Sequence, residues 1–181
     1  MHDFALICTQ GFADVLTLAR QNRVDPYALH VPASPWPQLL PAARRIGARG
    51  RIVATGAEAE PLDADGVLHA LAAVPQLPQR IAICLLFAHR NPAHEQALSQ
   101  QIRQRWPDIV VRCSHEVWPH DGEYERTLAT VQAQGLLPPP PPGRRGGPAP
   151  VGPLARQARG GQGGAAGHQH AIAFLEQAAH E

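Results

Sequence analysis

The sequence predicts an α/β fold, with a mixed or parallel sheet flanked by helices. Residues 81–88 form an unbroken apolar run without alternation, which is typical of a strand buried on both faces of a parallel sheet. A helical pattern follows, in which Leu98, Ile102 and Trp106 are spaced to share one face. A second strand begins at residues 109–111. Together these three segments predict a β-α-β unit.

The helix of this unit has a predicted start and end. Asn91 is expected to cap the first turn, and Pro92 stands where the missing N–H would have no helical partner anyway. Glu95 lies in the first turn, where the positive end of the helix dipole favours a carboxylate. We interpret Glu95 and its neighbour His94 as ordinary polar residues of a helix start. Pro107 is expected to end the helix.

The residues before this unit predict further elements. Residues 4–8 are expected to form a buried strand, followed by a turn at Gly11 and a helix over residues 13–19. Five prolines fall between residues 21 and 41, and they favour an irregular surface segment because they remove backbone donors. Residues 51–55 are expected to form a short strand.

Two further helices are predicted from their capping residues. Asp63 is expected to cap a helix over residues 64–74. His120 or Asp121 is expected to cap a last helix, which has Glu123 in its acidic first turn.

Length and composition predict one domain over residues 1–134 and a Pro/Gly/Arg-rich tail over residues 135–181. The 44% hydrophobic content supports a core, and the net charge of +1 gives no global field toward nucleic acid or an anionic membrane. No apolar run has the length of a membrane span and no signal peptide opens the chain, so we expect a cytoplasmic protein.

The tail has the composition of a disordered segment. Residues 138–142 are a proline run, and residues 143–167 consist mainly of glycine, proline, arginine and glutamine. Such a segment buries too little apolar surface to offset its chain entropy. Two origins of this tail stay open: it is a natural linker, or it results from a shifted reading frame.

Two groups of residues contain metal-ligating side chains, and both have a simpler interpretation. The cysteines lie in apolar, strand-like runs and form neither a disulfide framework nor a zinc pattern. They are Cys8, Cys84 and Cys113. A second group crowds a short polar stretch, but its spacing matches no helical histidine pair. It comprises His115, Glu116, His120, Asp121 and Glu123, and we interpret it as a polar loop before the last helix, with no metal.

Four blocks of sequence occur in a specific order. They are TQGFADVLTLARQNR at residues 9–23, PLDADGV at 61–67, AICLLFAHRNPAHE at 82–95 and EYERT at 123–127. Their order and spacing, over roughly residues 4–131, resemble the N-terminal region of the hydantoinase/oxoprolinase family. That family includes 5-oxoprolinase, N-methylhydantoinase and the related acetone carboxylases.

The resemblance implies a partial actin/hexokinase-like (ribonuclease H-like) lobe and an ATP-dependent opening of a cyclic amide, with ATP and Mg²⁺ as the family's cofactors. It implies as partners the remainder of the catalytic region or a second hydantoinase subunit. In the family a glycine-rich phosphate loop precedes the first matching strand, whereas here Met1 stands almost directly before that strand. We therefore expect a fragment that is inactive by itself and binds no nucleotide alone.

The resemblance also suggests which side chains contact a ligand or another domain. Arg20, Gln21 and Arg23 lie in the first block, and Tyr124 and Arg126 lie in the last. Guanidinium groups suit an anionic ligand. The alternative for the first three residues is a solvated helix end, where cations favour the negative pole of the dipole.

Two other functions stay open. The first alternative is that the chain is a non-catalytic remnant or a pseudogene product. In the second it is a binding module, because residues 145–147 and 159–161 resemble RGG segments that bind RNA and residues 139–144 fit a proline-rich protein ligand. The sequence leaves open the ring substrate, and whether a hydrolase or a carboxylase is the nearer relative.

Overall fold

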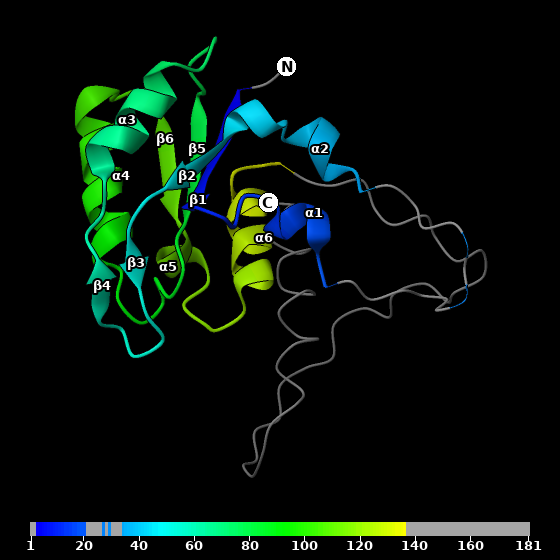
Figure 1. Ribbon diagram of the computed structural model, residues 1–181. Coiled ribbons are helices and arrows are strands. Elements are labelled where there is room, and N and C mark those ends of the chain that lie inside the picture. Colours follow the sequence, from blue (N-terminus) through cyan, green and yellow to red (C-terminus); the bar gives the residue numbers. More distant parts are fainter. Residues whose placement is uncertain (1–2, 21–26, 28, 30–33, 137–181) are drawn as a thin grey trace, which may run out of the picture. The chain divides into compact units, whose positions relative to one another are not determined.

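Strand β1 (Phe4–Thr9) lies inside a four-stranded parallel sheet, with β2 on one side and β5 on the other (Figure 1). In this computed structural model the sheet order is β2-β1-β5-β6. The other strands of the sheet are β2 (Arg45–Ala48), β5 (Arg80–Cys84) and β6 (Val110–Cys113). A separate antiparallel ribbon pairs β3 (Arg51–Ile52) with β4 (Glu58–Glu60). The structure describes residues 3–20, 27, 29 and 34–136.

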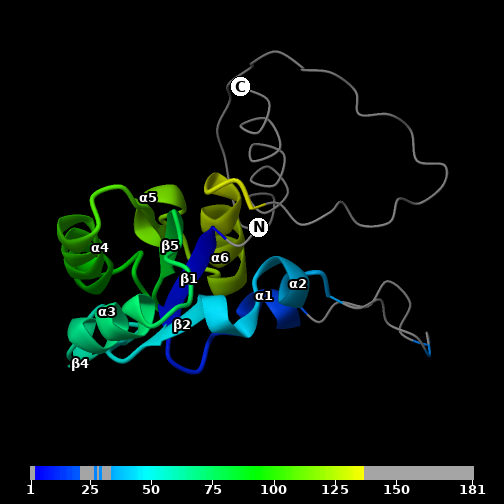
Figure 2. The same ribbon diagram turned by 90° about the horizontal axis from the view of Figure 1, so that it is seen from above.

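Helices cover both faces of the sheet (Figure 2). One face carries α3 (Ala64–Ala72) and α4 (Ala93–Arg105). The other carries α1 (Val15–Leu18), α2 (Trp36–Leu39) and α6 (Glu123–Ala133). A 3-10 turn, η1 (Ala42–Arg44), precedes β2, and the short helix α5 (Ser114–Val117) follows β6.

The central strands divide their side chains between two apolar clusters. In β1, Ala5 and Ile7 pack toward α3 and α4, while Phe4 and Leu6 pack toward α1, α2 and α6. All six residues of β1 are buried, because successive side chains of a strand point to opposite faces and each face is covered. A strand of this kind reads as a continuous apolar run, which is the signal that the sequence carries.

The chain reverses its direction across the sheet between β1 and β5. From β1 it crosses to β2 on one side, and it later returns to place β5 and β6 on the other side. The helices of the two crossover directions cover opposite faces, as right-handed connections require. Ligands of open α/β sheets bind at the carboxyl ends of strands beside such a reversal. The hydroxyl of Thr9, at the end of β1, accepts a hydrogen bond from the Leu86 N–H at 3.0 Å.

The α/β fold and its flanking helices are confirmed, but the strand predicted over residues 81–88 ends early. It stops at Cys84, because the next two N–H groups donate to side chains rather than to a neighbouring strand. Leu85 donates to Glu95 and Leu86 donates to Thr9. Phe87 then takes a left-handed conformation with φ of 55°, which no strand continues through.

The predicted helix start at Asp63 is confirmed, the start at Asn91 is shifted by one residue because Pro92 is the N-cap, and a third start is wrong. Asn91 accepts a hydrogen bond from the Ala93 N–H at 3.1 Å, and the Asp63 carboxylate accepts from the Gly66 N–H at 2.9 Å. Neither His120 nor Asp121 caps α6, which begins after Gly122. The Asp121 carboxylate instead lies 2.7 Å from the His89 ring.

Several short elements differ from the sequence prediction because they contain too few residues for a periodic pattern. The strands β2 and β4 and the helix α5 were not predicted. The strand predicted over residues 51–55 is only two residues long, and the helix predicted over residues 13–19 is reduced to α1. The predicted irregular segment includes the single turn α2. Most of that segment's first half and residues 137–181 of the tail lie outside the described residues. No helix among the described residues is long and apolar enough to span a membrane.

Helix α4 gives a matched pair of substitutions that tests the two-sided core. Leu98 is fully buried and Gln100 is exposed on the same helix. We expect Leu98→Ala to lower the free energy of unfolding by about 2–5 kcal/mol, because it leaves a cavity against the sheet. Gln100→Ala should change it by less than about 0.5 kcal/mol. Urea unfolding followed by circular dichroism measures both, and equal effects would contradict the assigned face.

Candidate functional site

A buried network of polar side chains lies at the carboxyl ends of β5 and β6. It connects the first turn of α4, the helix α5 and the first turns of α6. We call it the Glu95–Arg126 network, and its buried members are Glu95, Ser114 and Arg126. His89, His115, Asp121 and Glu123 complete it. Its location beside the chain reversal makes it the candidate functional site.

Glu95 is the acceptor at the centre of the network. Its side chain has no exposed surface, and four donors point to its two oxygens. Oε1 accepts from the Leu85 N–H at 2.8 Å and from the Ser114 hydroxyl at 2.6 Å. Oε2 contacts the backbone N–H of His115 at 3.0 Å and its Nδ1 at 2.6 Å. A buried carboxylate is tolerated only with such compensation, and here the compensation joins three elements.

His115 is oriented by this carboxylate. Because an ionised carboxylate can only accept, Nδ1 of His115 carries the proton. The hydrogen bond to Glu95 raises the pKa of His115, although burial opposes this effect. The side chain keeps 13% of its surface exposed. A histidine that is held by a buried carboxylate and keeps part of its side chain exposed has the chemistry of a proton donor or acceptor.

Arg126 is the donor that closes the network. Its side chain is 1% exposed, and its Nε donates to the Ser114 hydroxyl at 3.1 Å. One Nη2 proton goes to the Leu85 carbonyl at 3.0 Å, and the same nitrogen pairs with the Glu123 carboxylate. The guanidinium therefore fastens α6 to the end of β5. Burial raises the pKa of Glu123, and the neighbouring Arg126 charge opposes that rise.

Arg126 also determines the tautomer of His89. Nη1 of Arg126 lies 3.0 Å from Nδ1 of His89, and a guanidinium cannot accept a hydrogen bond. Nδ1 is therefore the acceptor and the proton resides on Nε2, which lies 2.7 Å from Oδ1 of Asp121. Burial lowers the pKa of His89, and the Arg126 charge lowers it further. The Nδ1 contact with Arg126 ties His89 to α6, so the ring holds the β5–α4 turn in place.

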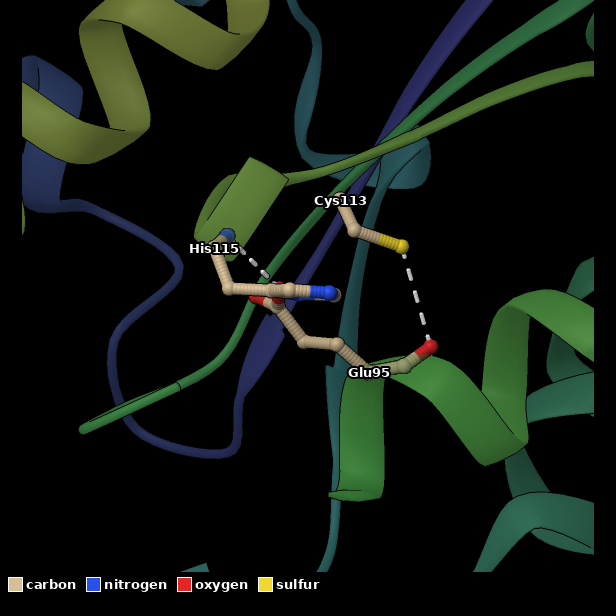
Figure 3. Close-up of side chains that lie close together, drawn as sticks. All are labelled: Glu95, Cys113 and His115. Atoms are coloured by element: carbon tan, nitrogen blue, oxygen red, sulfur yellow. Dashed lines mark hydrogen bonds and ion pairs between the residues drawn. The ribbon is translucent and has the colours of Figure 1, made fainter. Parts of the chain in front are cut away.

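Glu95, Cys113 and His115 lie close enough together to suggest a metal site (Figure 3). The Cys113 side chain points to the helix backbone instead, where Sγ lies 3.7 Å from the Glu95 carbonyl oxygen. Burial raises the pKa of the Cys113 thiol to about 12, so it is protonated, whereas metal ligation needs the thiolate. Both Glu95 carboxylate oxygens already accept two hydrogen bonds each. The donor set fits a structural network rather than a metal.

Residues 2–106 match the family model described as the hydantoinase/oxoprolinase N-terminal region. The chain belongs to this family. Among curated relatives it is similar to the caprolactamase subunit alpha of Pseudomonas jessenii, with 35% identity over 135 residues. It is also similar to the acetophenone carboxylase gamma subunit of Aromatoleum aromaticum, with 30% identity over 139 residues. These matches cover 74% and 70% of this chain but only 19% of each relative.

Two solved structures are similar in fold to this hydantoinase/oxoprolinase chain. The ATP-dependent caprolactamase of Pseudomonas jessenii matches with a TM-score of 0.65 and 33% identity, over 74% of this chain and 19% of that one. A nucleotide-free acetone carboxylase matches with a TM-score of 0.58 and 21% identity, over 74% of this chain and 20% of that one, and shows a similar fold. The chain thus spans about a fifth of the length of these relatives.

The residues predicted to contact a ligand or another domain occupy different places in this family member. Arg20 pairs with Glu125 of α6, and Tyr124 is partly buried beside the apolar cluster that contains Phe4 and Leu6. Arg126 lies inside the Glu95–Arg126 network. Gln21 and Arg23 lie outside the described residues. The role of these five residues in contacting a ligand or a domain stays a prediction.

The interpretation of Glu95 and His115 from sequence alone was wrong in its detail. Glu95 is a central buried acceptor rather than an ordinary helix-start residue, and His115 lies on α5 rather than in a loop. The spacing carried a usable signal, because Glu95 falls on the same helix face as Leu98 and Ile102. His94, its neighbour, contacts Glu58 of β4 at 2.8 Å.

Replacing the central carboxylate tests the network. In Glu95→Gln the amide NH₂ would face donors that now meet an oxygen. We expect the free energy of unfolding to fall by about 3 kcal/mol, the range for breaking a buried charged pair. Glu116→Gln, on the exposed side of α5, is the matched control and should change it by less than about 0.5 kcal/mol. Equal urea midpoints for the two variants would show that Glu95 is dispensable.

The two histidines of the network should titrate in opposite directions. The pKa of His115 is raised above its ordinary value of 6.5 and that of His89 is lowered below it. His115 therefore stabilises the fold fully below pH 6.5, and this contribution disappears as the pH rises through its folded pKa. His89 destabilises the fold as the pH falls below 6.5. Side-chain NMR titration measures both pKa values; His115→Asn and His89→Asn assign the signals, and two unshifted curves would contradict the geometry.

Proposed function

We propose that this chain is one part of an ATP-dependent enzyme that opens a cyclic amide, of the 5-oxoprolinase or N-methylhydantoinase type. The supporting observation is its membership of the hydantoinase/oxoprolinase family together with its similarity to a caprolactamase subunit. The chain is 35% identical to the caprolactamase subunit alpha and 30% identical to the acetophenone carboxylase gamma subunit, so a carboxylase is the second candidate. The remainder of the catalytic region or a second subunit is the proposed partner, since the chain spans only about a fifth of its relatives.

The described residues do not offer a ready site for Mg²⁺ at the carboxyl ends of β5 and β6. Glu95 is saturated by four donors, Glu123 is paired with Arg126, and Asp121 lies against His89 and Arg90. Magnesium requires carboxylates or waters that are free to complete an octahedron. We therefore assign the nucleotide and its metal to other parts of the enzyme, and propose that this chain does not turn over ATP by itself.

We propose that this chain contributes a rigid carboxyl edge of its sheet to the enzyme. The Glu95–Arg126 network holds the β5–α4 turn from both sides, through the Leu85 N–H and the Leu85 carbonyl. Positioning accounts for much of the catalysis of phosphoryl transfer, so a fixed loop at a domain edge suits such an enzyme. The three free, buried cysteines agree with a cytoplasmic location, which we also propose.

Reconstitution tests this function. The chain is assayed for ATP hydrolysis with caprolactam, 5-oxoproline or hydantoin, by itself and after mixing with the remaining catalytic region and the second subunit. We expect no lactam-dependent hydrolysis from the chain alone and clear hydrolysis from the mixture, with ATP without lactam as the control. Turnover by the chain alone would refute the division of labour. A stable but inactive complex would instead favour a non-catalytic remnant.

A further inference from the structure

A cavity of about 360 Å³ lies at the carboxyl ends of β1 and β2, outside the Glu95–Arg126 network. Its volume is at the lower end of the range for small-molecule sites. Its polar lining comes from Thr9 at the end of β1, Gln10 after it, Arg49 between β2 and β3, Arg51 of β3 and Glu60 of β4. Cavity and network therefore share one edge of the sheet but no side chain.

The lining presents mainly hydrogen-bond donors to the cavity. The Gln10 side-chain oxygen accepts from Nε of Arg49 at 3.2 Å, which leaves the amide NH₂ and the terminal nitrogens of Arg49 available. The Thr9 hydroxyl accepts from the Leu86 N–H, so its own proton is free to donate. Donors left over in this way are suited to a ligand that brings oxygen acceptors.

Among the described residues, neither guanidinium group forms an ion pair, although the Glu60 carboxylate lines the same cavity. In residues 3–20 and 34–136, where other arginines such as Arg45 and Arg80 form ion pairs, Arg49 and Arg51 form none. The Arg51 guanidinium lies 5.6 Å above the Phe12 ring, a cation–π arrangement that leaves its protons free. Arg49 donates only to the neutral Gln10.

The backbone that carries both arginines is fixed. The Arg49 carbonyl accepts from the Asp63 N–H at 3.0 Å, which ties this segment to the start of α3. Gly50 has φ of 127°, and a Cβ at this position would lie 2.8 Å from the Leu62 Cα. Only glycine permits such a close passage, so the separation of Arg49 and Arg51 is set by the fold.

We propose that this cavity binds an oxyanion, the carboxylate or phosphate group of a small molecule. Planar guanidinium groups suit either group because both present paired oxygens. Glu60 opposes Arg51 in the β3–β4 ribbon and leaves two positive charges against one negative charge. It should weaken the binding of anions, and most strongly that of a dianion. The site goes beyond the proposed function and does not depend on it, because the argument uses only the residues that line this cavity.

The test is a binding titration of the full chain, followed by NMR chemical shifts at constant ionic strength. Inorganic phosphate and acetate are the two probes, so that the arms separate a phosphate site from a carboxylate site. We expect saturable shifts at Thr9, Gln10 and Gly50 with at least one probe. Arg49→Gln and Arg51→Gln should each weaken binding about tenfold. Arg112→Gln, an exposed arginine at the opposite edge of the sheet, is the control of equal charge and should leave binding unchanged.

Glu60→Gln supplies a readout that cannot come from a loss of folding, because it should tighten binding, more for phosphate than for acetate. The proposal is overturned if neither probe gives a saturable shift. It is also overturned if Arg112→Gln weakens binding as much as Arg49→Gln, since general surface charge would then explain the effect. Urea midpoints of all four variants show whether each one is folded.

Discussion

The buried carboxylate of Glu95 is the constraint on which the carboxyl edge of this sheet depends. A carboxylate without exposed surface must receive hydrogen bonds, and here they come from Leu85 after β5 and from Ser114 and His115 on α5. These donors lie at the end of β5 and on α5, and Glu95 connects both segments to α4. The cost of leaving such an acceptor unpaired thus makes the end of β5 and the start of α5 fold against one helix.

Arg126 complements this acceptor, and the two groups never touch directly in the contacts that define the network. The Ser114 hydroxyl mediates between them, since it donates to Glu95 and accepts from Arg126. Such a chain of donors and acceptors polarises its members and works only when every one is satisfied. Its consequence is a β5–α4 turn that is held from its N–H, its carbonyl and the His89 ring.

Arginines at the same edge of the sheet serve opposite purposes. Arg126 is buried and donates its hydrogen bonds to other groups of the protein. Arg49 and Arg51 instead line a cavity and form no ion pair with a carboxylate among the described residues. The difference follows from their places in the fold. Arg126 lies on a helix packed over the sheet, while the other two flank a glycine in a connection at the sheet edge.

The sequence by itself determined the α/β class, the buried strands and the face of α4, because these rest on apolar periodicity and on capping side chains close in the chain. It also determined the family, through four collinear blocks. Tertiary structure alone decided that Glu95 is an interior acceptor, that Asp121 contacts His89 instead of capping α6, and that Arg49 and Arg51 share a cavity. These contacts join residues that are distant in the chain. A short-range sequence pattern does not indicate which distant residue will contact a given side chain in the folded protein.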